Sequence, residues 1–166
     1  MQTQNRQQGF SLIELLIVVA IIGIIAAIAI PNLLASRRAA NEGSAQQSLR
    51  TIHSAEATYQ ATAGNSNFGS MSELYGQKLV DPVLQTGTKS GYTFAVHETD
   101  ANSAATPPTL STFYATAVPV TTSGVSQTGT RRFGITDDGV LHGDSDDALA
   151  AYTDRADVIA GGLVGQ

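Results

Sequence analysis

The stretch FSLIELLIVVAIIGIIAAIAIPNLL, from Phe10 to Leu34, decides how this chain is organised. Between Leu15 and Ile30 it contains no polar side chain. At a rise of 1.5 Å per residue, a helix of this length would span about 38 Å. That is enough to cross the roughly 30 Å hydrocarbon core of a bilayer with some tilt. We therefore expect residues 10–34 to form a transmembrane helix.

One carboxylate, Glu14, interrupts this run close to its start. A charge at membrane depth costs roughly 2.5–3.5 kcal/mol on insertion scales, so it indicates a function by default. The alternative is a charge tolerated at the membrane interface. A secretory signal peptide is disfavoured, because its apolar core would be too long and no small-residue cleavage site follows cleanly. A plain signal anchor explains the length but neither Gly9 nor Glu14.

The combination of Gly9, Phe10, Glu14 and Pro31 resembles the class III signal and first helix of type IV pilins, and equally of type II secretion pseudopilins. The resemblance covers Phe10 to Leu34 with little departure. It implies that residues 1–9 are a leader removed by a prepilin peptidase after Gly9. It also implies that the new amino terminus, Phe10, is N-methylated, and that the segment between Gly23 and Pro31 can lose helical structure in a filament.

Glu14 would need a partner in an apolar surround. We expect this partner to be the positive amino terminus of Phe10 on a neighbouring subunit, which gives Glu14 a role in assembly. Arg6 favours a cytoplasmic leader, whereas Arg37 and Arg38 argue the opposite way. The resemblance decides for a leader inside and a C-terminal domain outside.

The helix is expected to continue through residues 35–63 as an amphipathic half. Its apolar stripe recurs at three- and four-residue steps: Ala45, Leu49, Ile52, Ala55 and Tyr59. Polar positions surround it: Arg37, Arg38, Glu42, Gln46, Arg50, His53 and Glu56. Pro31 is expected to kink this helix of about fifty residues, with Gly23 a second weak point. Ala63-Gly64-Asn65 is expected to end it.

Residues 64–166 are expected to form a globular head of loops and antiparallel strands. A short helix is expected at Met71–Tyr75, a turn at Asp81-Pro82, a hairpin turn at Asp137-Asp138-Gly139 and a flexible tail at Gly161–Gly165. The expected strands lie at 92–96, 113–120, 131–135 and 139–142. The predicted class is α+β: a type IV pilin fold, with the long helix packed on three or four antiparallel strands.

No catalytic constellation is visible, and we predict a protein that is not an enzyme and has no cofactor. The chain has no cysteine, which excludes disulfides and thiolate metal sites. His53, His97 and His142 lack metal spacing and are interpreted as surface or packing residues. Seven of the fourteen carboxylates gather near the C-terminus, and Asp144, Asp146 and Asp147 are weak calcium candidates. A solvated acidic loop is the favoured alternative, although major pseudopilins bind calcium in this general region.

The resulting hypothesis is a major pilin that polymerises into a type IV pilus on the cell surface. Its expected partners are further copies of itself, a prepilin peptidase, the inner-membrane assembly machinery and the membrane. The precursor would be a single-pass inner-membrane protein, and the product would be an extracellular pilus.

The alternative is a type II secretion pseudopilin, and a third class is a membrane-anchored enzyme or binding protein. A net charge of −5 argues against nucleic acid as a general partner. Binding of DNA would require a local basic patch, for which the pair Arg131-Arg132 is only thin support. Motility, adhesion, conductivity and glycosylation stay open.

Overall fold

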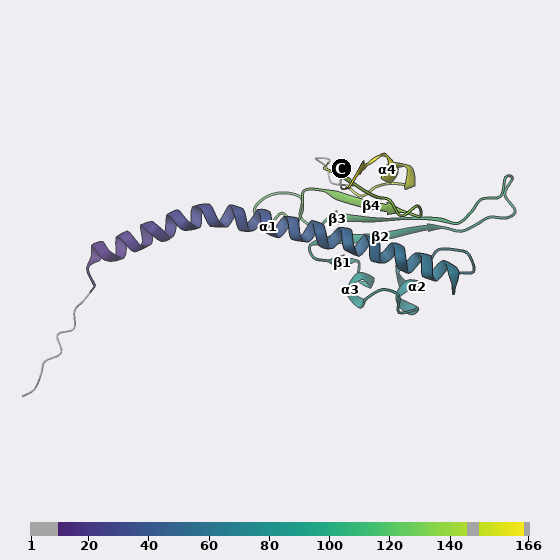
Figure 1. Ribbon diagram of the computed structural model, residues 1–166, viewed down its shortest axis with the longest axis horizontal. Coiled ribbons are helices and arrows are strands. Elements are labelled where there is room, and N and C mark those ends of the chain that lie inside the picture. The colour runs from purple at the N-terminus through teal and green to yellow at the C-terminus, as the bar shows by residue number, and fades with distance from the viewer. Residues whose placement is uncertain (1–9, 146–149, 165–166) are drawn as a thin grey trace, which may run out of the picture. The chain divides into compact units, whose positions relative to one another are not determined.

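The computed structural model describes residues 10–145 and 150–164 of the chain (Figure 1). These residues form two compact units, one up to Ser36 and one from Arg37 onward. The elements, in chain order, are α1 (Leu12–Ala61), α2 (Met71–Gly76), α3 (Pro82–Gln85), β1 (Thr88–Lys89), β2 (Tyr92–Thr99), β3 (Thr112–Pro119), β4 (Arg132–Thr136), β5 (Leu141–Asp144), α4 (Arg155–Ala160) and β6 (Gly162–Leu163).

Helix α1 is one element of 50 residues, as the sequence predicts. It stays helical through both Gly23 and Pro31. Next to the proline, the side-chain amide of Asn32 donates to the carbonyl oxygen of Ile28 at 3.1 Å. The expected kink at Pro31 stays a prediction. The helix ends at Ala61, just before the predicted stop, and its carbonyl at Tyr59 accepts the N–H of Gly64 at 2.8 Å.

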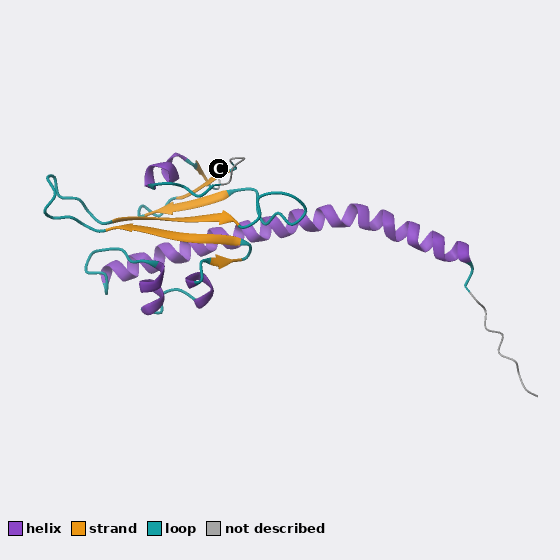
Figure 2. Cartoon of the chain, turned by 180° about the vertical axis from the view of Figure 1, so that it is seen from behind, coloured by secondary structure: helices purple, strands orange, loops and turns teal. Residues whose placement is uncertain are grey.

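The head contains an antiparallel sheet in the order β1-β2-β3-β4-β5-β6, so neighbours in the chain are neighbours in the sheet. Figure 2 shows the strands of the head in orange beside the second half of α1. The four longer strands, β2 to β5, confirm the prediction of three or four strands. The prediction did not include the two-residue strands β1 and β6, which add an edge on each side. Gly139, with φ of 76°, makes the predicted turn between β4 and β5.

The second half of α1 packs on one face of this sheet. Ala45, Leu49, Ile52 and Ala55 are buried and Tyr59 is partly buried, which confirms the predicted stripe. The sheet side chains in the same core are Tyr92, Phe94, Phe113, Ala115, Ala117, Phe133, Ile135 and Leu141. Glu56, predicted as one of the polar positions around the stripe, is instead completely buried. Glu56 follows Ile52 by four residues and precedes Tyr59 by three, so it lies on the inward-facing stripe of the helix, where the N–H of Gly69 contacts it from the loop after α1.

The opposite face of β4 is covered by α4 and by the segment before it, so every residue of β4 is buried. A Cβ placed on Gly134 would lie 2.7 Å from Val158 and 3.1 Å from Tyr152, so only glycine fits there without a shift. Sequence reasoning missed α4. The prediction of a flexible tail is wrong at Gly162–Leu163, because these residues pair with His142 and Gly143 of β5. Gly165 lies outside the described residues.

Two short helices precede the sheet. Helix α2 confirms the prediction at Met71–Tyr75 and begins with a capping box between Ser70 and Glu73. The predicted turn at Asp81-Pro82 is corrected, because these residues begin the helix α3. The Asp81 carboxylate accepts the N–H of Leu84 at 2.6 Å, and Pro82 occupies a first-turn position that suits its fixed φ.

Candidate processing and assembly site

The predicted cleavage point lies at the edge of the described residues. Gly9 and the rest of residues 1–9 are outside them, so the structure represents only the Phe10 side of the Gly9–Phe10 bond. Phe10 precedes α1 and is 84% exposed. Among the described residues, no hydrogen bond is found at its backbone or ring. Its surface is therefore open to other molecules.

Glu14 lies in the first turn of α1 and has a partner within its own chain. The backbone N–H of Ser11 donates to Glu14 Oε2 at 2.9 Å. Ser11 stands immediately before the helix, so this contact is one half of a capping box. A carboxylate in this position also interacts favourably with the positive end of the helix dipole. Sequence reasoning missed this role, although the S-x-x-E spacing of Ser11 and Glu14 was its signal.

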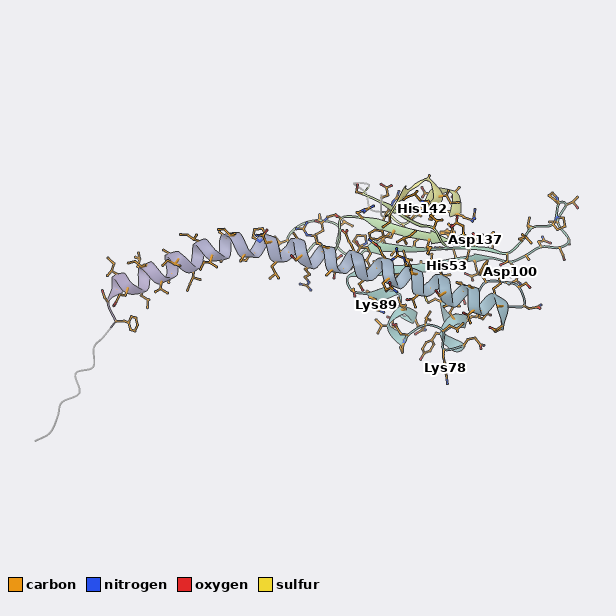
Figure 3. All side chains as sticks on the ribbon, viewed as in Figure 1. His53, Lys78, Lys89, Asp100, Asp137 and His142 are labelled. Carbon is orange, nitrogen blue, oxygen red and sulfur yellow. The ribbon has the colours of Figure 1, made fainter. Side chains whose placement is uncertain are left out.

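The first half of α1 presents apolar side chains on all sides (Figure 3). Every large apolar side chain from Leu12 to Leu33 is at least 51% exposed. The helix is long and apolar enough to cross a membrane. An exposed apolar surface of this extent marks a contact with lipid or with other proteins. Among the described residues, these side chains have no such cover.

Gly23 and Pro31, the predicted points of kinking or melting, are both helical here. A Cβ built on Gly23 meets no atom within 4 Å. Packing within the described chain therefore does not require glycine at this position. The proposed loss of helical structure in a filament stays a prediction for both residues.

The acidic residues near the C-terminus are mostly engaged in local structure. Asp137 pairs with Arg155, Asp138 accepts the N–H of Val140 at 2.9 Å, and Asp144 pairs with Arg132 at 3.1 Å. Asp154 caps α4, and Asp157 accepts the N–H of Thr153. Asp146 and Asp147, the other calcium candidates, lie outside the described residues. Within the described ranges, no group of three potential ligands is placed to hold a metal ion.

The three histidines have packing roles. His53 lies 5.9 Å from the Phe113 ring, His97 stacks on Tyr114 at 4.7 Å, and the buried His142 has Nδ1 at 2.9 Å from the carbonyl oxygen of Gly161. Arg132 is also buried, with its guanidinium 4.2 Å from the centre of the Tyr152 ring. This burial removes half of the Arg131-Arg132 pair from any basic surface.

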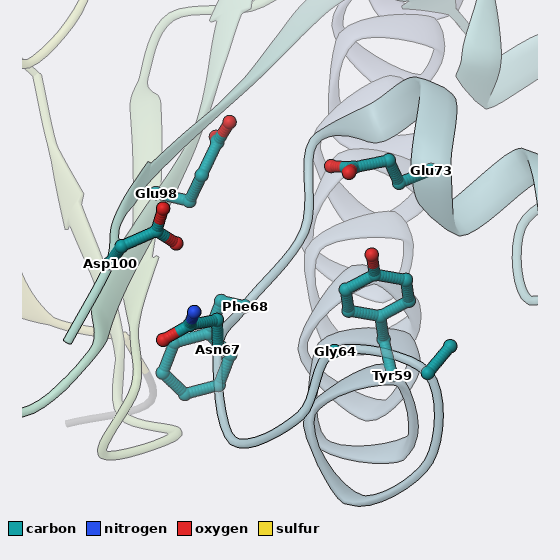
Figure 4. A pocket seen from close by; sticks show the side chains of 8 residues that line it. Tyr59, Gly64, Asn67, Phe68, Glu73, Glu98 and Asp100 are labelled. Carbon is teal, nitrogen blue, oxygen red and sulfur yellow. The ribbon is translucent and has the colours of Figure 1, made fainter.

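One pocket of the head, of about 320 Å³, has an acidic rim (Figure 4). Its lining includes Tyr59, Phe68, Glu73, Glu98 and Asp100. Hydrogen bonds from Ser70 hold the pKa of Glu73 below its ordinary value, so this carboxylate is ionised at neutral pH.

Comparison with known proteins agrees with the geometry of α1. Residues 4–30 match the family model described as the prokaryotic N-terminal methylation motif. The chain is 46% identical over 54 residues to the type IV major pilin protein of Myxococcus xanthus. The aligned segment covers 32% of this chain and 24% of that protein. It is 38% identical over 96 residues to the type IV wide pilus major component of Thermus thermophilus, covering 58% of this chain and 68% of that protein.

A more distant match is the type II secretion system core protein G of Pectobacterium carotovorum, 27% identical over 84 residues, or 51% of this chain and 53% of that protein. No solved structure matches the chain. Family membership confirms the prediction of a structural, non-enzymatic protein. The N-terminal methylation motif, the long apolar helix with Glu14 in its first turn and the extended match to a pilus component together place this chain in the type IV pilin family.

Proposed function

We propose that this chain is a major pilin, which is exported, cleaved, N-methylated and polymerised into a type IV filament on the cell surface. The observation that carries this proposal is the first half of α1, which is apolar on all sides, exposed and marked by one carboxylate. Lipid would cover this surface in the precursor, and neighbouring helices would cover it in the filament. The test is electron microscopy of sheared surface material, with identification of its main subunit.

The leader is proposed to be residues 1–9, removed by a prepilin peptidase after Gly9. The precursor would sit in the inner membrane with its head outside the cytoplasm. Intact-mass analysis should then show a subunit that begins at Phe10 and carries one additional methyl group. Retention of Met1 in assembled filaments would reject this step. Gly9→Val should block cleavage, because a branched side chain does not suit a site that accepts glycine.

Glu14 is proposed to bind the amine of Phe10 on a neighbouring subunit. Its Oε2 accepts the N–H of Ser11, and no other donor contacts the carboxylate among the described residues. Oε1 is therefore available to an amine that only cleavage creates. In a helical array each subunit can make this contact with the next. Leaving one such charge buried and unpaired is strongly destabilising.

Two variants separate this charge pairing from the capping role. Glu14→Gln retains an acceptor for the Ser11 N–H but removes the charge, whereas Glu14→Ala removes both. Charge pairing predicts few or no sheared filaments from either variant, with membrane insertion and cleavage intact. Normal filament yield from the glutamine variant would leave capping as the only role of Glu14. Glu14→Asp should partly restore assembly.

A type II secretion pseudopilin is the second candidate, because two core G proteins also match the chain at 27% and 30% identity. The higher identities to the two pilus components favour the surface pilus. Deleting the gene separates the two functions. Loss of surface pili with normal export of folded enzymes supports the pilin, and the reverse result supports the pseudopilin.

A further inference from the structure

A buried carboxyl group joins the long helix to the loop that follows it. The Glu56 side chain is 0% exposed, and its Oε2 accepts the N–H of Gly69 at 2.9 Å. Its Oε1 is also buried and has no hydrogen-bond partner among the described residues. This residue plays no part in the processing or assembly proposed above.

The contact closes the loop 62–70 over the helix. Within this loop, the Phe68 ring lies 4.7 Å from that of Phe113, and the Phe68 N–H donates to Ser111 Oγ at 3.1 Å. A Cβ on Gly69 would lie 2.7 Å from the Tyr59 ring, so the loop backbone presses against this ring. Opening the loop would therefore expose both the Glu56 carboxyl and the Phe68 contact.

Both the burial of Glu56 and the charges near it oppose the ionisation of its carboxyl group. Burial is the main cause that raises its pKa, from the ordinary 4.5 to about 7, and the Gly69 N–H offsets this only in part. Glu98 of β2 and Glu73 of α2 add to the rise. Tyr59 faces the same region from α1, Asp100 follows β2 there, and the loop 62–70 has no titratable side chain. The described groups around Glu56 thus supply no compensating cation.

We propose that Glu56 is a proton-controlled latch, which holds the loop 62–70 closed while its carboxyl is neutral and releases the loop when the carboxyl ionises. In the neutral form Oε1 carries the proton and Oε2 accepts from Gly69. In the ionised form the buried charge has one N–H donor, whereas in the open loop water hydrates it fully. Proton loss therefore favours the open loop.

The direction with pH follows from the raised pKa. The closed loop has its full stability below about pH 4.5 and loses this contribution as pH rises through about 7. Each unit by which the closed-loop pKa exceeds the open-loop pKa is a tenfold factor in the opening equilibrium. We expect opening to increase by at least on the order of tenfold between pH 5 and pH 8.

Hydrogen–deuterium exchange of the full-length chain in detergent micelles tests the latch. After correction for the intrinsic pH dependence of exchange, peptides covering residues 62–70 should lose protection as pH rises, with a midpoint near 7. Glu56→Gln, which is neutral at every pH, should remove this pH dependence. Glu42→Gln is the matched control: Glu42 also lies on α1 and accepts a loop N–H, from Thr130 at 2.7 Å, but it is not fully buried.

Protection of residues 62–70 that is independent of pH in the wild type would overturn the proposal. So would the same pH dependence in Glu56→Gln as in the wild type. If the glutamine variant does not fold, infrared spectroscopy of the folded wild type gives an independent result. A protonated carboxyl band that disappears near pH 7 together with loop protection supports the latch. The absence of such a band at pH 6 rejects it.

Discussion

Replacing Arg132 with lysine is expected to loosen the C-terminal end of the head. The Arg132 side chain lies over the Tyr152 ring, with its guanidinium carbon 4.2 Å from the ring centre. Its Nη1 donates to the carbonyl oxygen of Ala150 at 2.9 Å, and its Nη2 donates to Asp144 Oδ2 at 3.1 Å. One buried side chain thus connects β4, the end of β5 and the segment that leads to α4.

The magnitude follows from what lysine cannot reproduce. Lysine carries a compact charge without the planar fork of arginine, so it cannot lie flat on the ring while bonding both oxygens. A hydrogen bond to a charged group contributes about 1.5–3 kcal/mol, and a cation–π contact about 0.5–2 kcal/mol. The pair with Asp144 adds little, because the side chain of Asp144 is 39% exposed. We expect the free energy of unfolding to fall by about 2–3 kcal/mol.

Urea unfolding of the full-length chain in detergent micelles measures this loss. Near-ultraviolet circular dichroism is the suitable signal, because the chain has five tyrosines and no tryptophan. Arg155→Lys is the matched control: the Arg155 side chain is 39% exposed, against 10% for Arg132, and its replacement should change stability by less than about 1 kcal/mol. Equal losses from the two variants would refute the reasoning about Arg132.

Three further changes test single contacts. Gly134→Ala should destabilise the head by about 1–3 kcal/mol, measured by urea unfolding, because its Cβ would crowd Val158 and Tyr152; an unchanged midpoint would contradict the close packing of α4. Ser70→Ala should cost about 1 kcal/mol by removing the cap of α2, and hydrogen exchange should then show faster opening of residues 71–76 but not of α4. Gly23→Ala should leave far-ultraviolet helicity equal or higher, because open space surrounds Gly23 and alanine favours helix by about 1 kcal/mol; lower helicity would contradict this.

Local patterns made the helices and longer strands predictable. The stripe from Ala45 to Tyr59 repeats with the period of a helix, so its buried face could be identified before the sheet was known. Helix α4 was missed although its signal was present. Asp154 and Asp157 stand three residues apart before Val158, and Gly161 follows, which is a cap, a buried residue and a stop. The short spacing and the surrounding acidic residues made a solvated loop the simpler interpretation.

Non-local contacts account for the rest. Glu56 lies four residues after Ile52 and three before Tyr59, so helix periodicity alone places it on the buried stripe although its side chain is charged. Its hydrogen-bond partner, the N–H of Gly69, comes from the loop after the helix, and no sequence pattern indicates that contact. Strand β6 depends on pairing with β5, and a glycine-rich sequence gives no sign of that partner. The roles of Phe10 and Glu14 in processing and assembly were predicted from the sequence alone, and they stay predictions. Their roles still require a neighbouring subunit, which a single chain cannot supply.

The Ser11 contact gives Glu14 a role in the free subunit, in addition to the assembly role proposed for it. A backbone N–H and the positive end of α1 lower the cost of carrying this carboxylate into a membrane. They do so through one oxygen, so the charge is tolerated there without being neutralised. A neighbouring Phe10 amine would neutralise it, and only after cleavage. We therefore expect the filament, rather than the membrane, to be the state in which Glu14 is fully satisfied. That difference would favour transfer of cleaved subunits, and not of uncleaved precursor, from the membrane to the filament.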